Sequence, residues 1–187
     1  MKHDSRVIGA SAGGVRVLST LVAGLPSGLK ASLFLVQHLP ASYPSVLPQI
    51  LSGAGPLPAR HPAEGAMIEQ GNIYVAPPDH HLLIEEGHLH LGTGPKEHFV
   101  RPAVDVLFRS AAHSYGPRVV GVVLTGLGQD GAEGLLTIKQ HGGVAVIQDP
   151  GDALFPSMPE SAFVSTHIDF VLPLVNMAAF LVRLVSS

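Results

Sequence analysis

The sequence has no cysteine, little charge and no long apolar run, and each absence excludes a class of protein. Without cysteine there is no disulfide, no thiolate metal site and no cysteine nucleophile. Charged residues make up 13% of the chain against 46% hydrophobic residues, which excludes an intrinsically disordered protein and argues against an isolated coiled coil. No apolar run approaches the roughly 18 residues of a membrane span, so we expect no direct membrane insertion.

The charge balance also argues against nucleic acid as a partner. The formal net charge is −3, the 11 lysines and arginines are scattered, and no aromatic stacking pattern accompanies them. The N-terminus, Met1 to Asp4, carries an acid and lacks a signal-type apolar stretch. We therefore expect a cytoplasmic protein that binds no nucleic acid. The length of 187 residues fits a single domain over residues 1–187.

Two hydrophobic patterns alternate along the chain. Continuous apolar runs predict buried strands, and apolar residues at helical spacing predict helices between them. The strands are predicted at residues 6–10, 31–36, 72–76, 119–124, 144–147 and 170–172. The helical patterns cover residues 15–25, 46–51, 102–115, 135–138 and 177–184, with Pro102 in the first turn of the third helix. Residues 82–84 and 88–91 flank Glu85-Glu86-Gly87 and predict a hairpin with its acids at the tip.

This alternation predicts an α/β fold. We expect a doubly wound, mostly parallel sheet with helices on both faces and an antiparallel hairpin extension at one edge. In such a sheet, sites form beyond the carboxyl ends of the strands. Ser11 follows the first predicted strand, His38 follows the second, and Asp130 follows the strand at 119–124. If these strands are neighbours, the three side chains converge as a Ser-His-Asp triad.

Each residue type suits a step of nucleophilic catalysis. A serine hydroxyl becomes a useful nucleophile when a base takes its proton, and a histidine titrates near neutrality. A buried carboxylate fixes the imidazole tautomer and stabilises the imidazolium. Ser11 also lies in a Gly-x-Ser-x-Gly pattern between a strand and a helix, where small neighbours permit a sharp turn. The backbone amide of Ala12 would then be a natural oxyanion donor.

Less specific interpretations stay open for each residue. Ser11 could cap the following helix, and the glycine-rich turn could bind phosphate, although it lacks the features of a P-loop. The second strand ends in Gln37 and His38 instead of the acidic residue that binds a dinucleotide ribose, so we expect no nucleotide cofactor. His38 alone suits a partly buried polar role. Asp130 with Glu133 resembles a capping box for the next helix.

Two further groups of polar residues favour structural roles. His88-x-His90 on a strand places both rings on one face, but without an evident carboxylate-rich partner set we expect no metal there. Arg101 and Asp105 stand one helical turn apart, which predicts a structural ion pair.

The strand-end motifs and several others together resemble the catalytic domain of the CheB family, the chemotaxis-receptor protein-glutamate methylesterases. They follow the family's order and span about residues 6–175. The motifs are Ile8–Gly14, Val36–Pro40, Tyr74–Pro78, Arg101–Phe108, Leu124–Ala132 and Ser157–Glu160.

The resemblance implies a serine hydrolase that removes methyl groups from glutamate γ-methyl esters and can also deamidate receptor glutamines. It implies Ser11 as nucleophile, His38 as base and Asp130 as orienting acid. We also expect the amides of Ala12 and Leu127 to be oxyanion donors, and we expect no cofactor or metal. The expected partner is a methylated chemoreceptor or another glutamate-methylated protein. A non-catalytic binding module and a small-molecule carboxylic-ester hydrolase are the alternatives.

Three departures from the family pattern stand out. The family usually has threonine at the position of Ala12 and often methionine at that of Leu127. A backbone donor survives the first change, and the second roughly conserves volume. The first predicted strand begins by residue 6, so we expect a catalytic domain without the receiver domain that typically precedes it.

Overall fold

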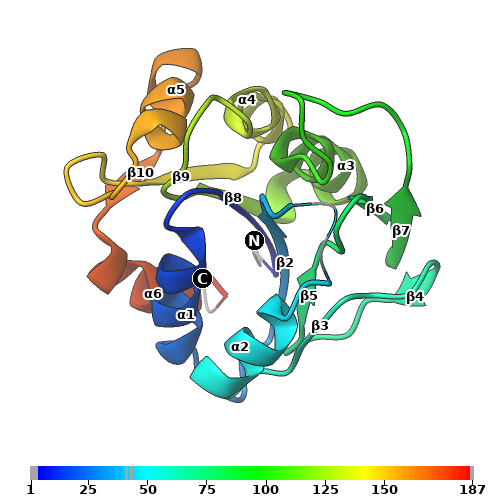
Figure 1. Ribbon diagram of the computed structural model, residues 1–187. Coiled ribbons are helices and arrows are strands. Elements are labelled where there is room, and N and C mark those ends of the chain that lie inside the picture. The colour runs from blue at the N-terminus through cyan, green and yellow to red at the C-terminus, as the bar shows by residue number, and fades with distance from the viewer. Residues whose placement is uncertain (1–3, 41, 43, 186–187) are drawn as a thin grey trace.

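The computed structural model describes residues 4–40, 42 and 44–185, and its centre is a parallel sheet of seven strands (Figure 1). Residues 1–3, on which the predicted cytoplasmic location partly rests, lie outside the described chain. The strands of this sheet are β1 (Ser5–Ala10), β2 (Ser32–Gln37), β3 (Ala59–Arg60), β5 (Ile73–Val75), β8 (Val119–Val123), β9 (Val144–Gln148) and β10 (Phe170–Leu172). Their order across the sheet is β10-β9-β8-β1-β2-β5-β3, and every neighbouring pair is parallel.

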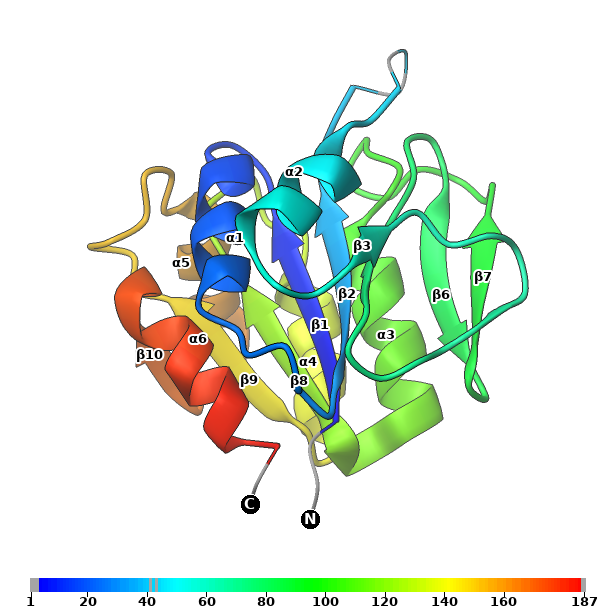
Figure 2. The ribbon, with the colours of Figure 1, turned by 90° about the horizontal axis from the view of Figure 1, so that it is seen from below.

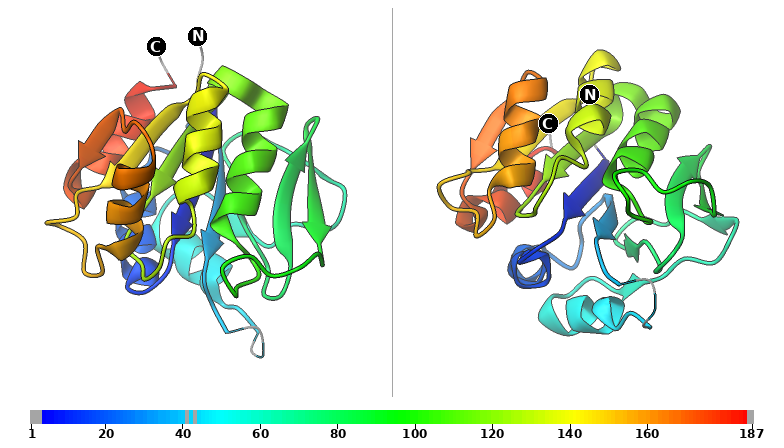
Figure 3. Two further views of the ribbon diagram at one scale, coloured as in Figure 1. Left: turned by 90° about the horizontal axis from the view of Figure 1, so that it is seen from above. Right: turned by 45° about the horizontal axis from the view of Figure 1, so that its top comes forward.

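Helices cover both faces of this sheet, as the sequence predicts. They are α1 (Gly14–Ala23), α2 (Leu47–Ala54), α3 (Val104–Tyr115), α4 (Ala132–Gln140), α5 (Ser157–Ser165), α6 (Leu174–Arg183) and the short 3₁₀ helix η1 (Gly116–Arg118). Figure 2 shows α1, α2 and α6 on one face, and the left view of Figure 3 shows α3, α4 and α5 on the other.

Successive side chains of β1 point to opposite faces of the sheet and so contribute to both layers of the core. Ile8 and Ala10 pack with α1, α2 and α6, whereas Val7 packs with α3, α4 and α5. A residue one step beyond Ala10 therefore belongs to the face of α3 and α4. In the described part of the chain no helix is long and apolar enough to cross a membrane.

The predicted hairpin is confirmed, and it belongs to a small antiparallel sheet. Strands β4 (Ala66–Met67), β7 (His88–Gly92) and β6 (His81–Glu85) pair in that order. The hairpin does not continue the large sheet, because β3 already occupies the edge next to β5. It packs against α3 instead, where Ser114 Oγ donates to the Ile84 carbonyl at 2.7 Å.

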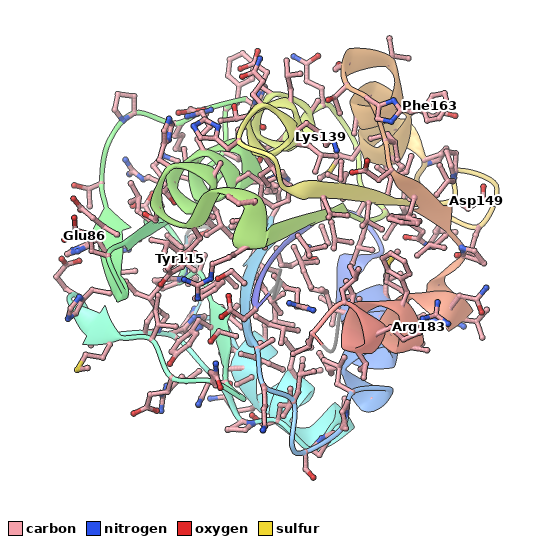
Figure 4. The ribbon with its side chains drawn as sticks, turned by 180° about the vertical axis from the view of Figure 1, so that it is seen from behind. Glu86, Tyr115, Lys139, Asp149, Phe163 and Arg183 are labelled. Carbon is pink, nitrogen blue, oxygen red and sulfur yellow. The ribbon has the colours of Figure 1, made fainter. Side chains whose placement is uncertain are left out.

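Two local predictions need correction. Pro102 does not begin the third helix, since α3 begins at Val104 after the extended residue Ala103. Helix α5 was not predicted, because apolar residues on its outer side obscure the helical period. Phe163 is 59% exposed and projects outward from α5 (Figure 4).

Candidate active site

The three residues of the expected triad follow three adjacent strands. Ser11 follows β1, His38 follows β2, and Asp130 lies in the loop between β8 and α4. Strand β1 lies between β2 and β8, with Ala10 opposite Gln37. From β1 the chain adds strands first on the β2 side and later on the β8 side, so the order reverses here. Open parallel sheets bind ligands at such a switch point.

The backbone holds Ser11 between the ends of β2 and β8. Its amide donates to the Thr125 carbonyl at 3.0 Å, and its own carbonyl accepts from Gln37 Nε2 at 2.8 Å. The residue that caps α1 is Gly13, at a φ of 76° and without a side-chain hydrogen bond, so the interpretation of Ser11 as a helix cap is wrong. The Ser11 hydroxyl makes no hydrogen bond with any described residue, which leaves it available to a substrate.

The Ser11 side chain faces the α3 and α4 side of the sheet. A Cβ added to Gly126 would lie 2.8 Å from Ser11 Cβ and would clash with the sulfur of Met158, a core residue of that side. His38 continues the alternation of β2 to the same side, since Val36 also packs there. Glycine at 126 therefore permits the close approach of the loop that leads to Asp130.

His38 and Asp130 are joined by a short contact. His38 Nε2 lies 2.7 Å from Asp130 Oδ2, and the two side chains are 14% and 2% exposed. Asp130 also accepts the amides of Val104 at 2.7 Å and Asp105 at 2.9 Å. Because Nε2 faces the carboxylate, Nδ1 is the ring nitrogen left for a proton transfer.

Asp130 therefore caps a different helix from the one expected. The predicted capping box with Glu133 is wrong, because Asp130 binds the first amides of α3 and not those of α4. The amides of Gly131 and Gly134, at the start of α4, donate instead to Asp105 Oδ1 at 3.0 and 2.6 Å. Each of the two helices thus receives its capping carboxylate from the start of the other.

The predicted ion pair between Arg101 and Asp105 is also wrong. Arg101 Nε and Nη2 bind Asp79 at 3.0 and 2.8 Å, because the side chain turns toward the small sheet. Asp105 pairs with His98, whose Nε2 lies 2.7 Å from Asp105 Oδ2. Burial raises the pKa of Asp105, and the nearby charge of Asp130 adds to this effect. Burial opposes the charged form of His98, but its bond to Asp105 and the negative charges around it prevail and raise its pKa.

Sequence reasoning assigned no site role to three side chains that support this arrangement. Gln37 donates to the carbonyls of Ser11 and His38. His81 is buried, with Nδ1 accepting the amide of Ala103 at 3.2 Å just before α3. His98 reaches Asp105 from a turn whose residues give no turn signature. Only Gln37, directly before His38 at a strand end, offered a positional signal.

The two expected oxyanion donors are unpaired in the structure. The amides of Ala12 and Leu127 make no hydrogen bond to any residue in ranges 4–40 and 44–185. The Ala12 carbonyl accepts from Thr125 Oγ1 at 3.1 Å, which ties the Ser11 turn to the end of β8. Both amides belong to loops that touch Ser11.

The histidines of the hairpin bind separate partners. His90 Nδ1 lies 2.7 Å from Glu64 Oε1, while His88 Nδ1 contacts the Glu86 carbonyl. Glu86 is exposed at the tip, as predicted (Figure 4). Among the described residues, one group of three has the spacing of a metal site, and its members are His98, Asp105 and Asp130.

Comparison with known proteins finds relatives in one family. The family model described as CheB methylesterase matches residues 6–181. A relative in Leptospira interrogans is 39% identical over 185 residues, which cover 98% of this chain and 96% of the relative. A relative in Methanosarcina mazei, named protein-glutamate methylesterase/protein-glutamine glutaminase 2, is 39% identical over 95% of this chain and 51% of its own length.

A solved structure extends the agreement to three dimensions. The crystal structure of the Thermotoga maritima CheB methylesterase catalytic domain has a TM-score of 0.93 and 32% sequence identity, and the match covers 99% of this chain and 100% of that one. Sequence and fold thus give the same result, and the chain belongs to the CheB methylesterase family.

Proposed function

We propose that this chain hydrolyses glutamate γ-methyl esters on proteins, with Ser11 as nucleophile, His38 as base and Asp130 as the acid that orients His38. The observation that carries the proposal is the 2.7 Å contact of His38 with the buried Asp130, beside the turn that holds Ser11. The membership of the chain in a methylesterase family supports the reaction class.

Acylation begins when Ser11 Oγ attacks the ester carbonyl. Asp130 holds the proton of His38 on Nε2, so Nδ1 takes the hydroxyl proton. The amides of Ala12 and Leu127 donate to the oxyanion that forms. The tetrahedral intermediate then collapses, the C–O bond to the methoxy group breaks, and His38 gives its proton to the departing methanol.

Deacylation repeats these steps with water. His38 takes a proton from water, the hydroxide attacks the acyl carbonyl, and the proton returns to Ser11 Oγ as glutamate is released. A glutamine side chain would follow the same route with ammonia as leaving group. The name of the Methanosarcina mazei relative includes this glutaminase activity.

The proposed substrate is a protein with methylated glutamates, such as a chemoreceptor. The proposed cellular location of the reaction is the cytoplasm. The mechanism uses no metal and no cofactor. A non-catalytic module on the same fold and a small-molecule ester hydrolase are the competing functions, and one assay separates them.

The test is methanol release from a methylated receptor fragment, combined with labelling of Ser11 by a fluorophosphonate probe. Wild type should release methanol and be labelled, and Ser11→Ala should do neither. Ser19→Ala is the matched control, since the Ser19 hydroxyl binds the Val15 carbonyl within α1 and serves no step of the reaction. Its release and labelling should equal those of wild type.

Three outcomes would contradict the proposal in different ways. Equal methanol release from wild type and Ser11→Ala would exclude the mechanism. An unlabelled wild type without turnover would favour the binding module. Turnover of a generic ester, but not of the methylated fragment, would favour the small-molecule hydrolase.

A further inference from the structure

The two carboxylates at the starts of α3 and α4 form a reciprocal pair. Asp130, before α4, accepts two amides at the start of α3, and Asp105, in α3, accepts two amides at the start of α4. Each carboxylate also contacts one histidine at 2.7 Å, His38 for Asp130 and His98 for Asp105. A shift of either carboxylate therefore moves the helix start that holds the other.

His98 is held in this pair by a tight turn. Glu97 and Val100 exchange two backbone hydrogen bonds of 3.1 and 2.9 Å, and the two residues between them have φ values of 50° for His98 and 65° for Phe99. Such a turn favours asparagine and glycine, so histidine and phenylalanine adopt it at a cost. The contact with the buried Asp105 offsets part of that cost.

The same turn borders the space in front of His38. A cavity of about 140 Å³ is lined by His38 and Leu39 on one side and by residues 96 and 99–102 on the other. The turn thus borders the cavity beside His38 and, through His98, also contacts the buried Asp105.

The charge of a protonated His98 would also matter, because two buried carboxylates lie close to its ring. Asp105 and Asp130 are two buried carboxylates, and one ring nitrogen of His98 lies within 4.8 Å of an oxygen of each. The other charged groups around His98 are Glu133 of α4 and the Arg109–Glu97 pair at the edge of the turn. Two neighbouring carboxylates resist joint ionisation unless a positive charge compensates them.

We propose that His98 and Asp105 are positioning residues of the site: Asp105 fixes the loop that carries Asp130, and protonated His98 balances the second carboxylate so that Asp130 stays ionised for His38. This proposal rests on the proposed triad and adds two residues behind it. Against the opposing effect of burial, the pKa of His98 is raised by its bond to Asp105 and by the negative charges around it, and this raised pKa favours the charged form.

A metal site at the same three residues fits the contacts less well. Asp130 Oδ2 already contacts His38 Nε2 and the Val104 amide. Asp105 Oδ2 already contacts His98 Nε2. The remaining carboxylate oxygens accept backbone amides. A cation there would have to displace His38 from Asp130, which the proposed mechanism needs.

The test is the rate of Ser11 labelling by a fluorophosphonate probe from pH 5 to 9, in wild type and His98→Gln. Glutamine can still donate to Asp105 but carries no charge, and the half-exposed turn tolerates it. The uncompensated negative charge should favour protonated His38 and move the midpoint of the rising limb up by about half a pH unit. The plateau rate should fall roughly threefold to tenfold, because the orientation of Asp130 loosens.

The double variant His98→Gln/Asp105→Asn separates charge from structure. Removing both charges should return the midpoint to that of wild type while the plateau stays low, a recovery that a purely structural role would not produce. His90→Gln is the matched control, since His90 also contacts a carboxylate at 2.7 Å but on the small sheet. Its profile should overlay that of wild type.

The proposal is overturned if the profile of folded His98→Gln overlays that of wild type, or if His90→Gln shifts it equally. His98→Gln alone decides the matter if the double variant does not fold. Failure of the proposed function is a separate result, because wild type itself would then not be labelled at Ser11.

Discussion

Two histidine–carboxylate pairs in this protein have the same contact distance and different surroundings. The shortest nitrogen–oxygen distance is 2.7 Å in both His38–Asp130 and His90–Glu64. The side chains of the first pair are 14% and 2% exposed, and those of the second are 39% and 61% exposed. The first lies at the carboxyl edge of the parallel sheet, and the second lies on the outer small sheet.

The difference shows that contact distance alone does not identify a functional pair. An exposed pair competes with water and salt, and it contributes little. A buried carboxylate needs donors for its oxygens, and the start of α3 supplies two amides to Asp130. Those amides fix the position of the Asp130 carboxylate, which is what the proposed role toward His38 requires.

The largest expected contrast is in activity. Asp130→Asn should lower methanol release by about 10³ to 10⁴-fold, because an amide can donate to His38 and favour the wrong tautomer. Glu64→Gln should leave methanol release within about twofold of wild type, because an exposed pair far from Ser11 affects no step. Steady-state assays of both folded variants on one methylated fragment make the comparison. Similar losses in the two variants would break it.

A smaller contrast is expected in stability. Asp130→Ala leaves the amides of Val104 and Asp105 without their acceptor at a buried helix start, so the free energy of unfolding should fall by about 1–3 kcal/mol. In Glu64→Ala the exposed Leu91 amide loses its carboxylate acceptor, but water can take that place. The unfolding curve of this variant should therefore nearly coincide with that of wild type. Urea unfolding followed by circular dichroism measures both. A larger loss for Glu64→Ala than for Asp130→Ala would reverse the argument.

The position of the site could be predicted because it follows from chain topology. Parallel strands end at one edge of a sheet, so Ser11, His38 and Asp130 converge once β2, β1 and β8 are neighbours. The apolar runs predicted those strands because buried parallel strands are continuously hydrophobic. The family resemblance then specified the reaction, which strand periodicity alone does not.

The partners of the buried carboxylates could not be predicted, because tertiary packing chooses them. Asp130 lies next to α4 in sequence, yet it caps α3, whose start is brought beside it only in the folded sheet. His98 was equally hidden, since His98-Phe99 is no turn signature and the contact with Asp105 crosses from loop to helix. Local patterns predict local caps, and here the nonlocal acceptor prevails.

The smallest expected contrast concerns the exposed pair, and acidification should remove it. The hydrogen bond from the Leu91 amide, together with the contact with His90, lowers the pKa of Glu64 below its ordinary value of 4.5. A carboxyl with a lowered pKa stabilises the folded state above its ordinary pKa, and this contribution is lost as pH falls through the lowered value. Wild type should therefore be slightly more stable than Glu64→Gln at pH 6, and it should lose this advantage at a pH well below 4.5. Urea midpoints at the two pH values measure it, with Glu86→Gln at the hairpin tip as the control. A difference that grows on acidification would contradict the assignment, because protonated Glu64 and glutamine then carry the same charge.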